Sequence, residues 1–209
     1  MKKITILALH LNFGGVEKYI SSLCKMLEED YQIEIISTYK VLDKPAFNFS
    51  DKIKIKYLIN DKPYKQEFKD SIKNKKIIPT IKYLFKNIYI LMLKNIKNIS
   101  AIKNIDSDII ITTRSFHNKL VWKYAKKNIV KIATEHNYHN NNNKYINNLV
   151  KSLKNLDYLI VVSKELQKFY QDKIGNTKCI YIPNVIDNIY DKPKFNTNHN
   201  LISVGRLEH

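Results

Sequence analysis

The sequence predicts an α/β fold: a doubly wound, mostly parallel Rossmann-like sheet of about seven strands with helices on both faces. Short apolar runs, each the length of one buried strand, recur along the 209 residues. Longer segments whose apolar residues recur at helical spacing separate these runs. Such alternation is typical of parallel sheets, because consecutive parallel strands need a crossover connection that is usually a helix.

The first strand, loop and helix form the clearest unit. Residues 4–9 are an apolar strand, residues 10–15 a loop ending in Gly14-Gly15, and residues 16–27 a helix. In an open parallel sheet the loop at a strand's carboxyl end is where ligands bind. Glycine lets backbone amides approach a ligand, and a helix N-terminus favours an anion. We therefore expect Gly14 and Gly15 to bind substrate, and Glu17 to cap the helix.

The remaining elements follow in order. Six further strands are expected, at residues 32–38, 53–59 (an edge strand), 108–113, 129–134, 157–163 and 178–182. Helices are expected from Pro79 to Ile99 and at residues 120–127, 145–154 and 164–173. Pro79 suits a first helical position and Ser163 suits an N-cap.

The charge of the chain points to an anionic partner. It has 36 basic and 19 acidic residues, a formal net charge of +17, and only Arg114 and Arg206 are arginines. Residues 62–103 contain eleven lysines and two acidic residues. This stretch is either a helix packed on the sheet with a solvated lysine face, or a basic amphipathic surface that contacts anionic lipid. Both interpretations are compatible with the sequence.

The cellular location is expected to be cytoplasmic, at most peripheral at the inner face of the plasma membrane. Cys24 and Cys179 lie in apolar segments, which indicates buried thiols and a reducing compartment. No signal-peptide pattern precedes the first strand, and no run of about 18 apolar residues occurs.

Four short motifs follow one another along the chain: Gly14-Gly15-Val16-Glu17, Val161-Val162-Ser163, the Pro-Asn-Val-Ile-Asp of residues 183–187, and the Val-Gly-Arg of residues 204–206. In this order and spacing they resemble the retaining GT-B glycosyltransferases of family 4, whose patterns are GG-x-E, VS, PNG-[IV]-D and VGR. The resemblance covers the whole chain. Val185 departs from it, because the family usually has glycine there.

The resemblance implies a domain organisation. Residues 1–186 would be the N-terminal acceptor-binding domain, residues 187–200 an interdomain linker, and residues 201–206 the first strand of a truncated donor-binding domain. Residues 207–209, Leu-Glu-His, are what a vector-encoded tag would leave. Without the missing donor-binding domain, this chain would have little activity of its own.

The resemblance also implies the reaction. The full enzyme would transfer a hexose or N-acetylhexosamine, with retention of anomeric configuration, to a surface-glycan acceptor, often lipid-linked. Its donor would be a nucleotide sugar, UDP- or GDP-linked, and no further cofactor is expected.

Candidate site residues follow strand ends. His136 comes directly after the fifth strand, and by the resemblance it matches the histidine that contacts the donor sugar and helps stabilise the transition state. An imidazole can donate a hydrogen bond to a sugar hydroxyl or to developing charge. The substrate-binding candidates at the same rim are Arg114, His117, Glu135 and His139. Arg206 matches the arginine that contacts the donor diphosphate.

Other functions receive less support. His136 and His139 are three residues apart, but no carboxylate or cysteine completes a metal site, so no metal is expected. There is no G-x-S-x-G hydrolase elbow and no carboxylate pair typical of a double-displacement glycosidase. Two alternatives stay open. One is a GT-B epimerase acting on UDP-sugars; the other is a basic nucleic-acid-binding module, although the lysines are spread along the chain and nucleic acid is not the expected partner.

Overall fold

The computed structural model describes residues 1–185. The expected linker at residues 187–200, strand at residues 201–206 and tag remnant at residues 207–209 lie outside this range, as does Arg206.

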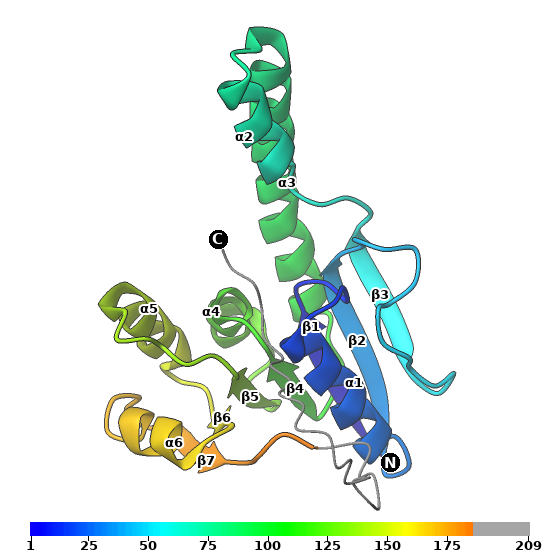
Figure 1. Ribbon diagram of the computed structural model, residues 1–209. Helices are drawn as coiled ribbons and strands as arrows, with labels where there is room; N and C mark the ends of the chain where they lie inside the picture. The colour runs from blue at the N-terminus through cyan, green and yellow to red at the C-terminus, as the bar shows by residue number, and fades with distance from the viewer. Residues whose placement is uncertain (186–209) are drawn as a thin grey trace, which may run out of the picture.

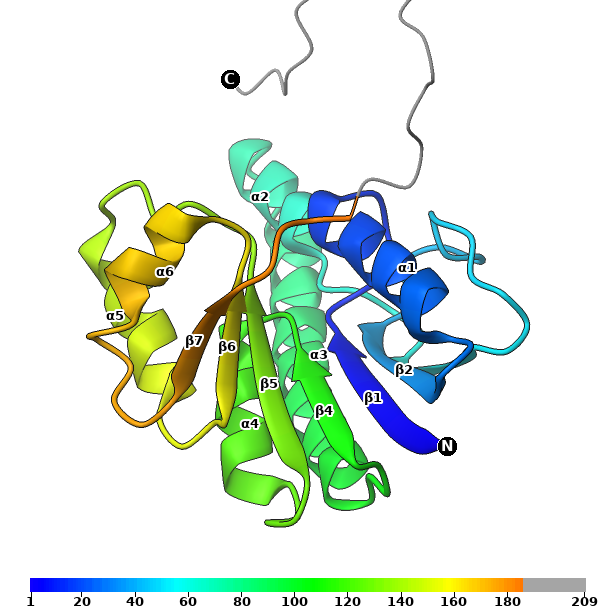
Figure 2. The ribbon, with the colours of Figure 1, turned by 90° about the horizontal axis from the view of Figure 1, so that it is seen from below.

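The described residues form one sheet of seven strands, all parallel, in the order β3-β2-β1-β4-β5-β6-β7 (Figures 1 and 2). The strands are β1 (Lys2–Ala8), β2 (Tyr31–Tyr39), β3 (Lys54–Ile59), β4 (Ile109–Thr112), β5 (Val130–Glu135), β6 (Tyr158–Val161) and β7 (Lys178–Tyr181). This confirms the predicted fold class and the edge position of β3. The strand order reverses between β1 and β4, and such sheets bind ligands in the crevice at that point.

Helices cover both faces of the sheet, as predicted. They are α1 (Gly15–Leu27), α2 (Lys65–Lys73), α3 (Ile77–Lys103), α4 (Ser115–Tyr124), α5 (Asn143–Leu153) and α6 (Lys164–Tyr170). Successive residues of β1 point to opposite faces. Ile4 and Ile6 belong to a core with residues of α1, whereas Leu7 belongs to a larger core that includes residues of α3, α4, α5 and α6.

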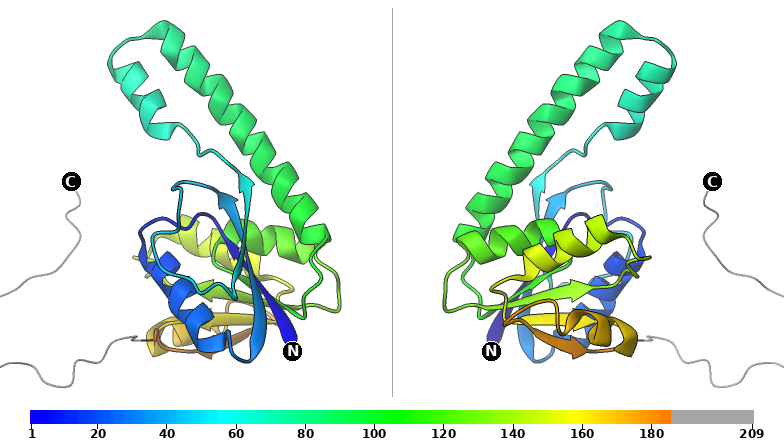
Figure 3. Two further views of the ribbon diagram at one scale, coloured as in Figure 1. Left: turned by 90° about the vertical axis from the view of Figure 1, so that its right-hand side faces the viewer. Right: turned by 90° about the vertical axis from the view of Figure 1, so that its left-hand side faces the viewer.

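The helix α2 was not predicted. It packs on the first half of α3, where Thr80 donates a hydrogen bond to Ser71 at 2.9 Å and the rings of Tyr64 and Tyr83 stack at 5.7 Å. The two helices project from the sheet (Figures 1 and 3). We define the arm as residues 65–89, because at Ile90 the helix α3 becomes buried against Tyr39 and Ile59 at the ends of β2 and β3.

Two helix starts differ from the prediction. The helix α3 begins at Ile77, so Pro79 is its third residue, where the missing N–H costs no helical hydrogen bond. The helix α4 begins at Ser115 rather than residue 120, with Arg114 as its N-cap. Its first turn buries His117 and Asn118. Because these buried residues are polar, the first turn lacks the apolar periodicity that predicts a helix. The predicted Ser163 cap is confirmed, because its side chain accepts from the Leu166 N–H at 3.2 Å.

The two thiols are free, and burial raises the pKa of Cys24 to about 12; Cys24 is buried as expected, while Cys179 is only partly buried. Within residues 1–185 no helix combines the length and apolarity that a membrane span requires.

Candidate active site

Three loops meet at the carboxyl ends of β1, β4 and β5, beside the point where the strand order reverses. They carry His10, Arg114 and His136, and His10 lies more than 100 residues before the other two in the sequence. Because parallel strands end at the same edge, the strand order alone brings these loops together.

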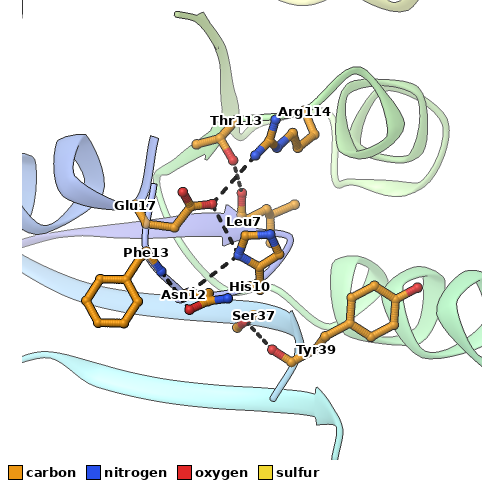
Figure 4. Close-up of polar contacts among 9 residues, drawn as sticks. All are labelled: Leu7, His10, Asn12, Phe13, Glu17, Ser37, Tyr39, Thr113 and Arg114. Atoms are coloured by element: carbon orange, nitrogen blue, oxygen red, sulfur yellow. Dashed lines mark hydrogen bonds and ion pairs between the residues drawn. The ribbon is translucent and has the colours of Figure 1, made fainter. Parts of the chain in front are cut away.

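The buried carboxylate of Glu17 is the centre of a polar cluster (Figure 4). Its Oε1 lies 3.3 Å from His10 Nδ1 and 3.6 Å from Arg114 Nη2. The carboxylate lies in the first turn of α1, where the helix dipole also favours negative charge. Glu17 therefore joins the loops that follow β1 and β4, and its capping role stays a prediction. The Glu of the GG-x-E motif was the signal for it, but His10 had no signal in the sequence.

Burial lowers the pKa of His10, the negative charge of Glu17 opposes that shift, and the positive charge of Arg114 adds to it. Thr113 fixes the position of the β4 loop, because its hydroxyl donates to the Leu7 carbonyl at 3.1 Å.

Gly14 is required for space rather than for backbone conformation. It is the N-cap of α1 with φ 171° and ψ 159°, an extended conformation open to any residue. A Cβ at this position would overlap Oε2 of Glu17, whereas a Cβ on Gly15 would meet nothing within 4 Å. The predicted contact of both glycines with substrate stays a prediction.

Gly14→Ala should destabilise the domain by ~1–3 kcal/mol, because the new methyl group displaces the Glu17 carboxylate from its two partners. Gly15→Ala is the matched control, and it should keep or raise stability, since alanine is a better helix former. The free energy of unfolding in urea measures both. Equal effects of the two substitutions would contradict the steric role of Gly14.

His136 follows β5 directly, as predicted, and its ring lies 4.1 Å from the Tyr19 ring of α1, centroid to centroid. Both ring nitrogens are shielded from solvent, and neither makes a hydrogen bond of normal geometry within residues 1–185. Burial lowers its pKa to about 4, helped by the positive charge of Arg114 and opposed by the side chain of Asn184. The imidazole is therefore neutral at physiological pH, with one donor and one acceptor nitrogen available.

Arg114 and Glu135 line one cavity of about 270 Å³ at this edge. Lys94 of α3 lines it too, with its ammonium 3.6 Å from the centre of the Phe116 ring. Glu135 is buried; its Oε1 accepts from the Asn137 N–H at 2.8 Å, and the Tyr145 hydroxyl also bonds to it. Burial raises the pKa of Glu135 and these hydrogen bonds oppose the rise. A cavity with two cations and one carboxylate suits an anionic group next to a hydroxyl.

His117 does not lie on this rim. It is fully buried in the first turn of α4, and burial lowers its pKa to about 3. Its Nε2 lies 3.0 Å from the Thr38 hydroxyl, which donates to Asn98 Oδ1 at 3.1 Å. Because the threonine proton goes to Asn98, His117 donates to Thr38. The chain of hydrogen bonds joins α4, β2 and α3. A substrate role for His117 stays a prediction, and its burial favours a structural one.

His139 is also buried, in an aromatic stack outside the cavity. Its ring lies 4.7 Å from Tyr138 and 4.0 Å from Phe169, centroid to centroid, and its Nδ1 accepts from the Asn141 N–H at 3.0 Å. This arrangement fixes the loop onto α6, and substrate binding by His139 stays a prediction.

A larger hollow of about 730 Å³ lies at the opposite end of the sheet, lined by the first halves of β1, β2 and β3 and the last turns of α3. It is remote from the carboxyl ends of the strands, where the ligands of such folds bind. We therefore place the candidate site at the rim. Among residues 1–185 no three His, Cys, Asp or Glu side chains come together as a metal site requires.

Comparisons with known proteins agree with this geometry. The family model described as Glycosyltransferase Family 4 matches residues 13–188. No curated protein sequence matched the chain.

Solved structures share the fold. Sucrose-phosphate synthase from Thermosynechococcus elongatus superposes with a TM-score of 0.54 at 12% identity, over 88% of this chain and 48% of that one. TcCGT1 in complex with UDP gives a TM-score of 0.50 at 11% identity, over 91% of this chain and 53% of that one. The chain thus spans about half the length of these neighbours. At such low sequence identity, the similarity shows a shared fold only. Since the family model covers residues 13–188, this chain belongs to glycosyltransferase family 4, as the N-terminal domain of a GT-B fold.

Proposed function

We propose that the chain is the acceptor-binding half of a retaining glycosyltransferase that moves a hexose or N-acetylhexosamine from a nucleotide sugar to a surface-glycan acceptor, lipid-linked at the membrane. One observation carries the proposal. At the crevice of the sheet, the neutral imidazole of His136 makes no hydrogen bond of normal geometry within residues 1–185, and it lies beside the cluster of Glu17 and Arg114.

The donor would occupy the space between this domain and a second, donor-binding domain. The UDP bound by TcCGT1, a protein of the same fold, supports a nucleotide-linked donor. In this arrangement His136 donates a hydrogen bond to a sugar hydroxyl and stabilises charge that develops at the anomeric centre. The N-terminus of α1, next to Gly15, supplies partial positive charge toward a diphosphate.

The acceptor would bind at the cavity lined by Lys94, Arg114 and Glu135. The two cations suit a phosphate or carboxylate of the acceptor, while Glu135 can accept a hydrogen bond from its hydroxyl. A lipid-linked acceptor would require the enzyme to work at a membrane surface, and we propose the inner face of the plasma membrane.

The full-length enzyme, incubated with UDP- and GDP-sugars and a lipid-phosphate-linked glycan, tests this proposal. A new glycosidic bond should form as the nucleoside diphosphate is released, and NMR coupling of the anomeric proton should show the donor's configuration retained. Epimerised or hydrolysed sugar without a glycoside would favour the epimerase alternative. An inverted product would overturn the retaining mechanism.

Arg114→Gln should raise the KM for an anionic acceptor about tenfold or more, because a hydrogen bond to a charged group is lost. The matched control is Lys123→Gln, which removes a cation from the last turn of the same helix, away from the cavity. Steady-state kinetics with charged and uncharged acceptors measure both. If Arg114→Gln changed the KM for the charged and the uncharged acceptor equally, Arg114 would not bind the anionic group.

A further inference from the structure

The helix α3 exposes a continuous apolar face that begins in the arm and extends beyond it to Ile96. Large apolar side chains of α3 recur at steps of three or four residues, so they form one stripe along the helix. Exposure is high: 81% for Ile78 and 66% for Phe85. We define the apolar stripe by its members, which are Ile78, Ile81, Phe85, Ile88, Met92 and Ile96. Exposed apolar patches of this continuity mark interaction sites.

The stripe is not the contact surface between the two arm helices. The side of α3 that faces α2 is a different one, formed by Thr80, Tyr83 and Asn87, whose side chains contact Ser71 or Tyr64. Helix pairing therefore fixes the orientation of α3, and the stripe points away from α2 on an already packed arm.

Positive charge is concentrated in this part of the chain. Residues 62–103 carry eleven lysines against two acidic residues. Lys82 and Lys86 are exposed within the arm, and Lys86 lies 4.6 Å from the centre of the Tyr64 ring. Lysine stems can lie along apolar surface while their ammonium groups reach an anionic layer.

Two kinds of partner fit the stripe: a second copy of the chain and an anionic lipid surface. The three-and-four spacing of the stripe would suit a coiled coil with a second copy of the chain. A second copy, however, would bring an equally lysine-rich arm alongside, and like charges on facing helices repel. An anionic lipid surface offers both an apolar layer and the opposite charge, and each nearby lysine contributes attraction.

We infer that the arm binds an anionic lipid bilayer, with the apolar stripe of α3 buried at the boundary between headgroups and acyl chains. The binding itself does not depend on glycosyl transfer. It deepens the lipid-linked acceptor of the proposed function, because Lys94, just beyond the arm on α3, lines the same cavity as Arg114. The arm also continues from the carboxyl end of β3, the edge where the candidate site lies (Figure 3).

A fluorescence experiment on the 209-residue chain tests insertion directly. Trp122→Phe removes the single tryptophan of the sequence, and Phe85→Trp then places a reporter in the stripe. With vesicles of phosphatidylcholine and phosphatidylglycerol, the emission should shift to the blue, and lipids brominated in the acyl chain should quench it. Binding without shift or quenching would mean attraction by charge alone and would overturn the inference.

Vesicle flotation with matched variants completes the test. The double substitution Ile81→Gln and Phe85→Gln should weaken binding about tenfold or more, because two large apolar groups leave the interface. Trp122→Gln, an equally exposed apolar residue outside the arm, should leave binding unchanged. Added salt should weaken binding of every variant. Sedimentation velocity tests the alternative of a second copy. If the chain is a dimer that the double substitution converts to a monomer, and it does not insert into vesicles, the stripe binds a second copy instead.

Discussion

Replacing His136 by alanine in the full-length enzyme should lower turnover by about 100-fold or more. The neutral imidazole would stabilise charge that develops only in the transition state, and a single such donor in a shielded site is worth that much. The KM for the donor should change far less than kcat, because the interaction strengthens as the reaction proceeds. Steady-state kinetics with saturating acceptor measure both quantities.

The pH dependence adds a second readout for His136. Since its pKa is lowered to about 4, the imidazole stays neutral from about pH 5 to 8. Titration of His136 should therefore cause no change of kcat with pH in this range. Tyr138→Phe is the control in the same loop; it keeps the ring that stacks on His139 and should keep full turnover. Unchanged turnover in His136→Ala would exclude His136 from catalysis.

The domain should lose stability as the pH falls from about 6.5 toward 3, and His117→Leu should reduce that dependence. In the folded state burial holds the pKa of His117 at about 3, while in the unfolded chain it is near its ordinary value of 6.5. Between these values the unfolded state binds a proton that the folded state does not. The stabilisation is thus complete above pH 6.5 and declines below it, by up to ~1.4 kcal/mol per pH unit.

Urea unfolding at a series of pH values measures how the free energy of unfolding changes with pH. His117→Leu also loses the hydrogen bond to Thr38, but that loss lowers stability equally at every pH and leaves the slope unchanged. His136→Leu is the comparison, because a folded pKa of about 4 limits its contribution to the range from 6.5 to 4. Below pH 4 only the His117 substitution should still flatten the curve. Parallel curves for wild type and His117→Leu would contradict the buried neutral state.

The strands were predicted to within a few residues, because buried parallel strands are runs of apolar, often β-branched residues with a strong local signal. The helix α2 was missed. Its nine residues contain only two large apolar side chains, Phe68 and Ile72, and Ile72 is exposed. Its packing on α3 through residues such as Ser71 is a tertiary contact that no local pattern reveals.

The rim of the site was predictable from position, since residues after parallel strands meet at one edge. His136 and Arg114 were placed there correctly, as was Glu135, which follows the same strand. Which of them meet one another was not predictable. The Glu17 carboxylate joins His10 and Arg114 only because β4 lies next to β1 in the sheet.

By itself, the sequence determined the alternation of strands and helices, the parallel sheet, the glycosyltransferase family and the edge at which the site lies. All of these depend on local periodicity or on short motifs. The tertiary structure alone decided that Glu17 joins two strand loops, that His117 and His139 are buried, and that the apolar stripe of α3 is uncovered. Burial and pairing depend on strand order and helix packing, which bring together residues far apart in the chain and leave others without a neighbour.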